Sequence, residues 1–145
     1  MKLRPRLFPP ESRFFPGQRW INIGLRTLHL LGMAGIGAAF LVPGAADGAW
    51  HDYLWLTLAS GLGLILIFVW SNGIWLIQLR GQAILLKVLL LALIPVWPSA
   101  GPALFAAVVL LSGIISHAPA RVRYFSPFHG RMLESLPERR DLFRR

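Results

Sequence analysis

Four long apolar stretches, separated by turns, dominate the order of hydrophobic and polar positions along the chain. They cover about 20–42, 53–77, 81–97 and 102–116. A helix that crosses the hydrocarbon of a bilayer needs about 20 mostly apolar residues. The first two stretches meet this length, and the two shorter ones can cross where the bilayer is locally thinned. The pattern predicts an all-α, polytopic membrane protein with four transmembrane helices in a bundle.

The turns between the stretches contain residues that break helices. The segment 43–48 holds proline and glycine, 78–82 is short and polar, and 95–102 holds three prolines. Proline lacks a backbone donor and clashes with the preceding helical turn, so these segments are expected to be loops. A second interpretation makes 81–117 a re-entrant hairpin. In both interpretations the chain returns to the side on which the third stretch begins.

The chain divides into three parts by composition. A basic arm, 1–19, precedes the four-helix transmembrane domain, 20–118, and a basic, aromatic tail, 119–145, follows it. The first apolar stretch is too long for the apolar region of a cleaved secretory signal, so we expect it to be retained as a helix.

The composition separates this chain from soluble proteins. Of its 145 residues, 55% are hydrophobic and 14% are charged, although the net charge is +9. The hydrophobicity excludes a disordered basic protein. The basic residues lie mostly outside the apolar stretches and not within a polar domain, so no nucleic-acid partner is expected. The absence of cysteine excludes disulfides and thiol catalysis.

Lysine and arginine fall on one predicted side of the membrane. The arm, the 78–82 turn and the tail hold nearly all of them, whereas the loops 43–52 and 98–101 hold none. Cytoplasmic segments of membrane proteins carry the excess of these residues. Both termini are therefore predicted to be cytoplasmic, in the inner membrane of a bacterium.

Small residues are concentrated in the first two stretches, where they allow helices to approach closely in lipid. Their spacing predicts a contact between these two helices near the outer half of the membrane, or a contact of one small-residue face with another protein. The residues expected there are Gly32, Ala34, Gly35, Ala38, Ala39, Ala59 and Gly63.

Two basic residues lie inside the apolar stretches, where ionisable groups are costly. Arg26 and Lys87 are each close to a predicted cytoplasmic end. Long basic side chains in such positions extend to the headgroups. This is the expected role of both residues, with a buried role as the alternative for Lys87. The stretches contain no Asp or Glu, which argues against a carboxylate relay.

Histidines supply the candidate chemistry. His29 and His117 are predicted to lie in one layer with Lys87, and two imidazoles on different helices can ligate a haem iron or a metal. The alternative is that both histidines are interfacial or hydrogen-bonded. His51 lies beside Asp52 at the outer surface and is a candidate for a weak cation site. No nucleophile with an acid–base pair is visible, so no enzymatic activity is expected.

Both predicted cytoplasmic tails combine basic and aromatic residues. Such sequences suit anionic lipid headgroups, where each charge is worth about 1 kcal/mol, and they also suit protein interfaces. The residues expected to contact lipid or a partner are Arg13, Arg19, Trp20, Arg121, Arg123, Tyr124, Phe125, Phe128 and Arg131.

Two segments resemble small bacterial membrane proteins of the copper-resistance protein D type. Arg-Thr-Leu-His-Leu-Leu-Gly at 26–32 is similar to that family's first helix, and Gly-Gln-Ala-Ile-Leu-Leu-Lys at 81–87 is similar to its glycine-to-lysine helix start. The similarity extends over 25–93. It implies a four-helix membrane module that handles copper or haem, with His29 and Lys87 as the matching positions.

The leading hypothesis is a non-enzymatic integral protein of the bacterial inner membrane. It is an accessory or scaffold subunit without a cofactor, and it packs against a membrane partner complex. Its expected contacts are anionic headgroups and other membrane protein subunits. The alternative is a module that binds haem b or copper through His29 and His117.

Overall fold

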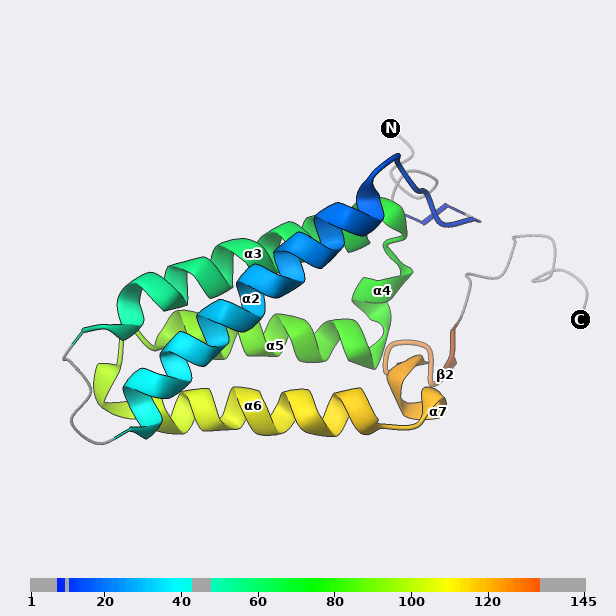
Figure 1. Ribbon diagram of the computed structural model, residues 1–145. Coiled ribbons are helices and arrows are strands. Elements are labelled where there is room, and N and C mark those ends of the chain that lie inside the picture. The colour runs from blue at the N-terminus through cyan, green and yellow to red at the C-terminus, as the bar shows by residue number, and fades with distance from the viewer. Residues whose placement is uncertain (1–7, 10, 43–47, 134–145) are drawn as a thin grey trace, which may run out of the picture.

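The computed structural model describes residues 8–9, 11–42 and 48–133 and is mostly helical. Four long helices make up most of it, and short elements lie between and after them (Figure 1). The long helices are α2 (Gln18–Leu41), α3 (Trp50–Ser71), α5 (Leu79–Leu93) and α6 (Gly101–His117). The short elements are α4 (Ile74–Ile77), η1 (Pro98–Ala100), α7 (Ala120–Arg123), and the antiparallel strands β1 (Phe125–Ser126) and β2 (Arg131–Met132).

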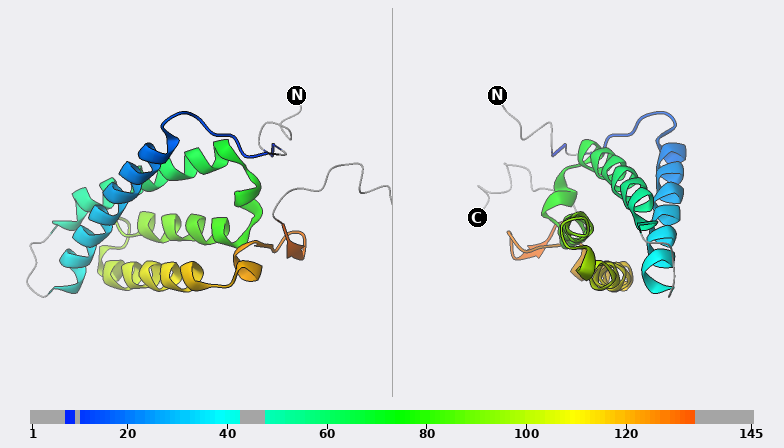
Figure 2. Two further views of the ribbon diagram at one scale, coloured as in Figure 1. Left: turned by 45° about the vertical axis from the view of Figure 1, so that its right-hand side comes forward. Right: turned by 90° about the vertical axis from the view of Figure 1, so that its left-hand side faces the viewer.

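The long helices form two antiparallel pairs. α2 lies against α3, and α5 lies against α6 (Figures 1 and 2). We call the end that holds α4, α7 and the β1–β2 hairpin the hairpin end, and the opposite end the η1 end. α2 crosses α3 obliquely and meets α6 towards the η1 end (Figure 1).

Three helical segments are long and apolar enough to cross a membrane. They are Gln18–Leu41, Trp50–Ser71 and Pro98–His117, the last of which joins η1 to α6. These segments agree with the prediction of a helical membrane protein. α5 has 15 residues, which at 1.5 Å per residue is about 22 Å, less than the roughly 30 Å of a hydrocarbon core.

The second predicted helix ends earlier than the hydrophobic pattern indicates. α3 stops at Ser71, and Asn72 is extended, with φ −164°. The Asn72 Oδ1 accepts a hydrogen bond from the Ile74 N–H at 3.1 Å, which starts the separate helix α4. The main bend therefore covers 72–78, and most of the predicted 78–82 turn belongs to α5. Hydropathy missed this break because α4 is itself apolar.

The third predicted stretch also ends early. α5 finishes at Leu93, and a turn over 94–97 replaces the last residues of the stretch. Pro95 lies within this turn and Pro98 lies just after it. Neither ring permits a continuous helix, which explains why α5 ends here.

A buried apolar cluster joins the four long helices towards the η1 end. Phe40 on α2 contacts the Trp50 ring at 5.7 Å and the Phe105 ring at 6.1 Å between centroids. The fully buried members are Ile36, Leu54, Leu91, Ile94, Phe105 and Val108. The two helix pairs are thus held together mainly at this end.

Glycines set the distance between α2 and α3. A Cβ atom at Gly32 would overlap the Thr57 side chain and lie 2.9 Å from the Tyr53 carbonyl oxygen. A Cβ atom at Gly35 would overlap the Tyr53 ring. Gly63 faces Leu25 across the same contact. Close approach of this kind favours helix association in lipid, where burial from water provides no driving force.

The alanines of the small-residue pattern lie elsewhere. Ala34, Ala38 and Ala59 are exposed, and Ala39 is half-buried. The contact between α2 and α3 is therefore built on glycines, and the Ala34–Ala38 pair lies on the outside of the molecule.

Gly32 and Gly24 provide a matched pair of substitutions on α2. Gly32→Ala is expected to destabilise the fold by about 1–3 kcal/mol, because the new methyl group meets the backbone of α3. Gly24→Ala, with nothing within 4 Å of the new atom, is expected to stabilise it by up to about 1 kcal/mol through helix propensity. Denaturation in mild detergent measures both. Equal effects of the two substitutions would contradict the close contact.

Candidate functional site

A cavity of about 130 Å³ lies between the two helix pairs. Side chains from all four long helices and from α4 line it. Most of its wall is apolar, including Leu64, Phe68, Trp75, Ile84, Val88 and Val108. Three polar side chains also reach it, namely His29 on α2, Lys87 on α5 and Ser112 on α6. The cavity combines an apolar wall with a small polar group of side chains.

His29 is held against α3 in one tautomer. Its Nδ1 lies 3.0 Å from the Thr57 carbonyl oxygen and 3.4 Å from Ser60 Oγ. A carbonyl oxygen only accepts, so Nδ1 carries the proton and donates it. Ser60 directs its own hydroxyl to the Leu56 carbonyl at 2.6 Å. In the neutral ring with this tautomer, the His29 Nε2 is the acceptor nitrogen.

Lys87 extends into the bundle. Its Nζ donates a hydrogen bond to Ser112 Oγ at 3.1 Å, which links α5 to α6. The chain has no Asp or Glu between Asp52 and Glu134. No Asp or Glu lies among the residues that line the cavity. Lys87 is half-buried, and its bond to Ser112 directs the side chain towards α6.

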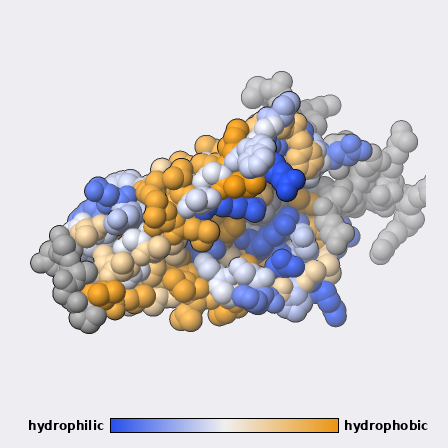
Figure 3. All heavy atoms as spheres, viewed as in Figure 1, coloured by the Kyte–Doolittle hydropathy of each residue, from blue (hydrophilic) through white to orange (hydrophobic). Residues whose placement is uncertain are grey.

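Arg26 does not line the cavity. Its side chain is exposed, whereas His29, three residues later, is half-buried. Residues three apart are neighbours on a helix surface, but only His29 reaches the cavity. Figure 3 shows hydrophilic side chains between α2 and α6 on an otherwise largely apolar face.

The other histidines lie apart from this cavity. His117 is exposed at the end of α6, and its Nδ1 lies 2.8 Å from the Gly113 carbonyl oxygen. His51 stacks on Trp50 at 3.7 Å between centroids and binds the Gly48 carbonyl. Within the described part of the chain, no three or more His, Cys, Asp or Glu residues gather as metal ligands. Asp47, the further acidic residue near His51, lies outside the described residues.

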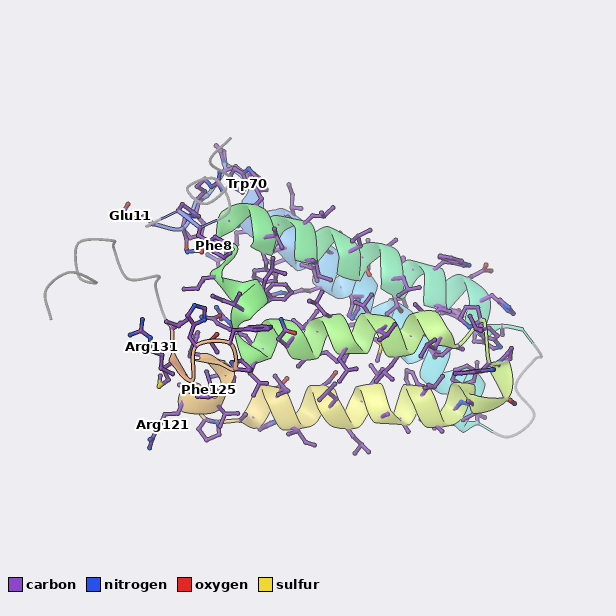
Figure 4. The ribbon with its side chains drawn as sticks, turned by 180° about the vertical axis from the view of Figure 1, so that it is seen from behind. Phe8, Glu11, Trp70, Arg121, Phe125 and Arg131 are labelled. Carbon is purple, nitrogen blue, oxygen red and sulfur yellow. The ribbon has the colours of Figure 1, made fainter. Side chains whose placement is uncertain are left out.

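The basic arm docks on the end of α3. The Arg13 N–H donates to the Ser71 carbonyl at 3.0 Å, and the Ser71 hydroxyl donates to the Arg13 carbonyl at 2.7 Å. The Arg13 guanidinium lies 5.4 Å from the Trp70 ring centroid, and Phe15 meets the same ring edge-on at 5.5 Å. Arg19 and Trp20 are exposed. The part of the arm from Arg13 to Arg19 thus lies at the hairpin end, where Figure 4 shows Trp70.

The β1–β2 hairpin docks on the start of α5 through Gln78, a residue that sequence reasoning treated only as part of a turn. The Gln78 side chain is fully buried. Its amide nitrogen donates to the Leu133 carbonyl, and its oxygen accepts from Arg80 Nε at 2.7 Å. The Arg80 guanidinium also lies 4.5 Å from the Tyr124 ring centroid. No signal within the turn itself marks a partner 55 residues away.

The predicted contact residues of the tail differ in exposure. Arg121, Phe128 and Arg131 are exposed, while Arg123, Tyr124 and Phe125 are half-buried. Figure 4 shows Arg121, Phe125 and Arg131 grouped at the hairpin end. The exposed basic residues of the tail are free to meet headgroups or a partner, and the half-buried aromatic ones hold the hairpin in place.

No protein-family model, curated protein or solved structure matches this chain. The resemblance to the copper-resistance protein D type stays a prediction. The functional argument therefore rests on the geometry of the cavity, of the two docked tails and of the exposed helix faces.

Gln78→Leu tests the docking of the hairpin. It removes the hydrogen bonds to Leu133 and Arg80 and leaves the Leu133 carbonyl unpaired, which costs about 1–3 kcal/mol. We expect faster hydrogen exchange over 124–133, including the Leu133 amide, which donates to the Tyr124 carbonyl. Arg121→Ala, an exposed change in the same segment, is the control. Unchanged exchange in Gln78→Leu would contradict the role of this side chain.

Proposed function

We propose that this chain is a non-enzymatic, multi-pass protein of the bacterial inner membrane that acts as an accessory or scaffold subunit and packs α2 against a membrane partner. The observation that carries this proposal is the exposure of α2. Only 11% of its most apolar window is buried, compared with 28% in α3. The rest of the chain covers only a small part of this spanning helix. Its exposed side therefore has room for a second protein.

The outward side of α2 has the composition of a helix contact. Arg26, Leu30, Ala34 and Ala38 are all exposed, and residues four apart lie on one face of a helix. We call these four residues the outward stripe. Ala34 and Ala38 have the small-xxx-small spacing that lets a second helix approach closely in lipid. Arg26 adds a donor for a carboxylate of a partner or for a lipid headgroup.

The four-helix topology belongs to the same proposal. The hydrogen bonds from Arg13 to Ser71 and from Gln78 to Leu133 bring both described ends of the chain to the hairpin end. A chain that begins and ends on one side crosses an even number of times, so α5 is the fourth crossing segment. Its short helix suits a locally thinned bilayer or added interfacial residues from 94–97.

The charge distribution supports an orientation with the hairpin end in the cytoplasm. Exposed basic residues such as Arg19, Arg121 and Arg131 lie at the hairpin end. The positive-inside rule assigns this end to the cytoplasm, where anionic headgroups also attract it.

A second candidate function, haem b or copper binding, is favoured by one contact. Metal-ligating histidines usually donate their other ring N–H to a carbonyl or carboxylate, and His29 donates to the Thr57 carbonyl in this way. His117 does not line the cavity that His29 lines. The accessory-subunit proposal therefore stands first.

Ala34→Leu tests the outward stripe. A tagged chain purified from its host in mild detergent is expected to bring a membrane partner at fixed stoichiometry. The larger side chain should reduce that yield about tenfold, as expected for overpacking of 1–3 kcal/mol. Ala106→Leu, an exposed change on α6, should leave it unchanged. A chain that purifies alone would contradict the proposal. A haem absorption band or stoichiometric copper that is lost in His29→Ala would favour the second candidate.

A pair of reporter fusions tests the topology. A reporter that works only outside the cytoplasm should be inactive after Arg145 and active when inserted next to Gly48. Activity after Arg145 would overturn the predicted orientation, and activity at both positions would also overturn the three crossings proposed between Gly48 and Arg145.

A further inference from the structure

We propose that the cavity between the helix pairs binds the head of a single-chain amphiphile with a carboxylate, with Lys87 and Ser112 as its hydrogen-bond donors. This inference goes beyond the accessory-subunit function and is independent of the partner of α2. It rests on an unpaired cation, an apolar cavity of suitable size and a donor set that matches a carboxylate.

The first observation is that none of the described residues provides a counter-ion for Lys87. Its ammonium group has three N–H donors, and the described residues show one hydrogen bond from it, to Ser112. The chain supplies no carboxylate between Asp52 and Glu134. A cation held inside a bundle in lipid is costly unless it is paired. An anion that enters from the membrane completes the site.

The second observation is the shape and lining of the cavity. Its volume of about 130 Å³ is close to the roughly 150 Å³ of an apolar cavity that holds benzene. It therefore admits a small polar head with a few attached carbon atoms, but not a whole phospholipid. Leu64, Ile65, Phe68 and Val88 line it, and these side chains suit an alkyl chain.

The third observation is the direction of the available protons. Ser112 Oγ accepts a hydrogen bond from Lys87 and therefore keeps its own hydroxyl proton for donation. Lys87 and Ser112 can thus donate to the two oxygens of one carboxylate. Charge-assisted hydrogen bonds of this kind are about twice as strong as neutral ones. A cationic head is repelled, and a neutral alcohol gains only the weaker bonds.

The site is accessible from outside the bundle. Lys87 and Ser112 are both half-buried, so the protein does not enclose them completely. An amphiphile can leave its alkyl tail in the surrounding lipid while its head occupies the cavity.

Titration with three amphiphiles that differ only in the head group tests this site directly. The full-length protein in a non-ionic maltoside detergent is titrated with dodecanoate, dodecanol and dodecyltrimethylammonium, and binding is followed by native mass spectrometry and by thermal denaturation. We expect one dodecanoate per chain and a raised melting temperature. Dodecanol and the ammonium compound should bind at least about tenfold more weakly, since each 1.4 kcal/mol is a factor of ten.

The variants separate the site from general charge attraction. Lys87→Met should weaken dodecanoate binding at least about tenfold and Ser112→Ala several-fold. Lys2→Met removes a lysine outside the apolar stretches and should leave the affinity unchanged. Equal affinity in Lys87→Met and the unchanged protein would overturn the proposal, as would an equal loss in Lys2→Met. Dodecyl phosphate, titrated in parallel, shows whether the pocket selects carboxylate over phosphate, and tighter binding of the phosphate would also overturn it.

A stability control keeps the test independent of folding. Without ligand, Lys87→Met should melt at the same or a higher temperature, because methionine fills the space without an unpaired charge. If Lys87→Met does not fold, Ser112→Ala decides the matter by the same titration. Failure of dodecanoate binding would leave the co-purification of a partner through the outward stripe untouched, so the two proposals fail separately.

Discussion

The structure depends on how the chain satisfies its backbone polar groups where it leaves α3. In a membrane protein, such groups find partners within the protein wherever water is excluded. At the bend over 72–78 the helical hydrogen bonds are interrupted, and side chains replace some of them. Asn72 accepts the Ile74 N–H, and the Gln82 amide donates to the Leu76 carbonyl. Gln78, fully buried, extends the same network to Leu133.

This bend explains several features that are distant in sequence. Its partners come from the arm, through Ser71 and Arg13, and from the β1–β2 hairpin, through Gln78 and Leu133. The two described ends of the chain therefore gather at one corner. α4 also places Trp75 against Phe68, with 5.9 Å between ring centroids, and both rings line the cavity. The cavity lies between this bend and the apolar cluster towards the η1 end.

The sequence alone predicts the long helices, but it does not predict the bend. Apolar stretches with breaker residues between them predict helices, because the hydrophobic signal extends over many residues. The bend depends on one hydrogen bond from Asn72 and on a partner of Gln78 that lies 55 residues away. A local sequence pattern predicts neither this hydrogen bond nor this distant partner. The sequence likewise did not predict which way the Lys87 side chain points. That direction depends on how α5 is rotated relative to α6, which carries Ser112.

The two sides of α2 differ in burial. His29, Gly32 and Ile36 lie at spacings of three and four and face the rest of the bundle, while the outward stripe faces away from it. The glycine contact at Gly32 fixes the distance between α2 and α3. A partner that moved α2 would therefore have to carry α3 with it, or lose that contact. Because His29 lines the cavity from α2 and Lys87 lines it from α5, any movement of the first helix pair against the second changes the space around the ammonium group. The packing of the two pairs therefore sets the size of the cavity, whereas none of the four residues of the outward stripe lines it.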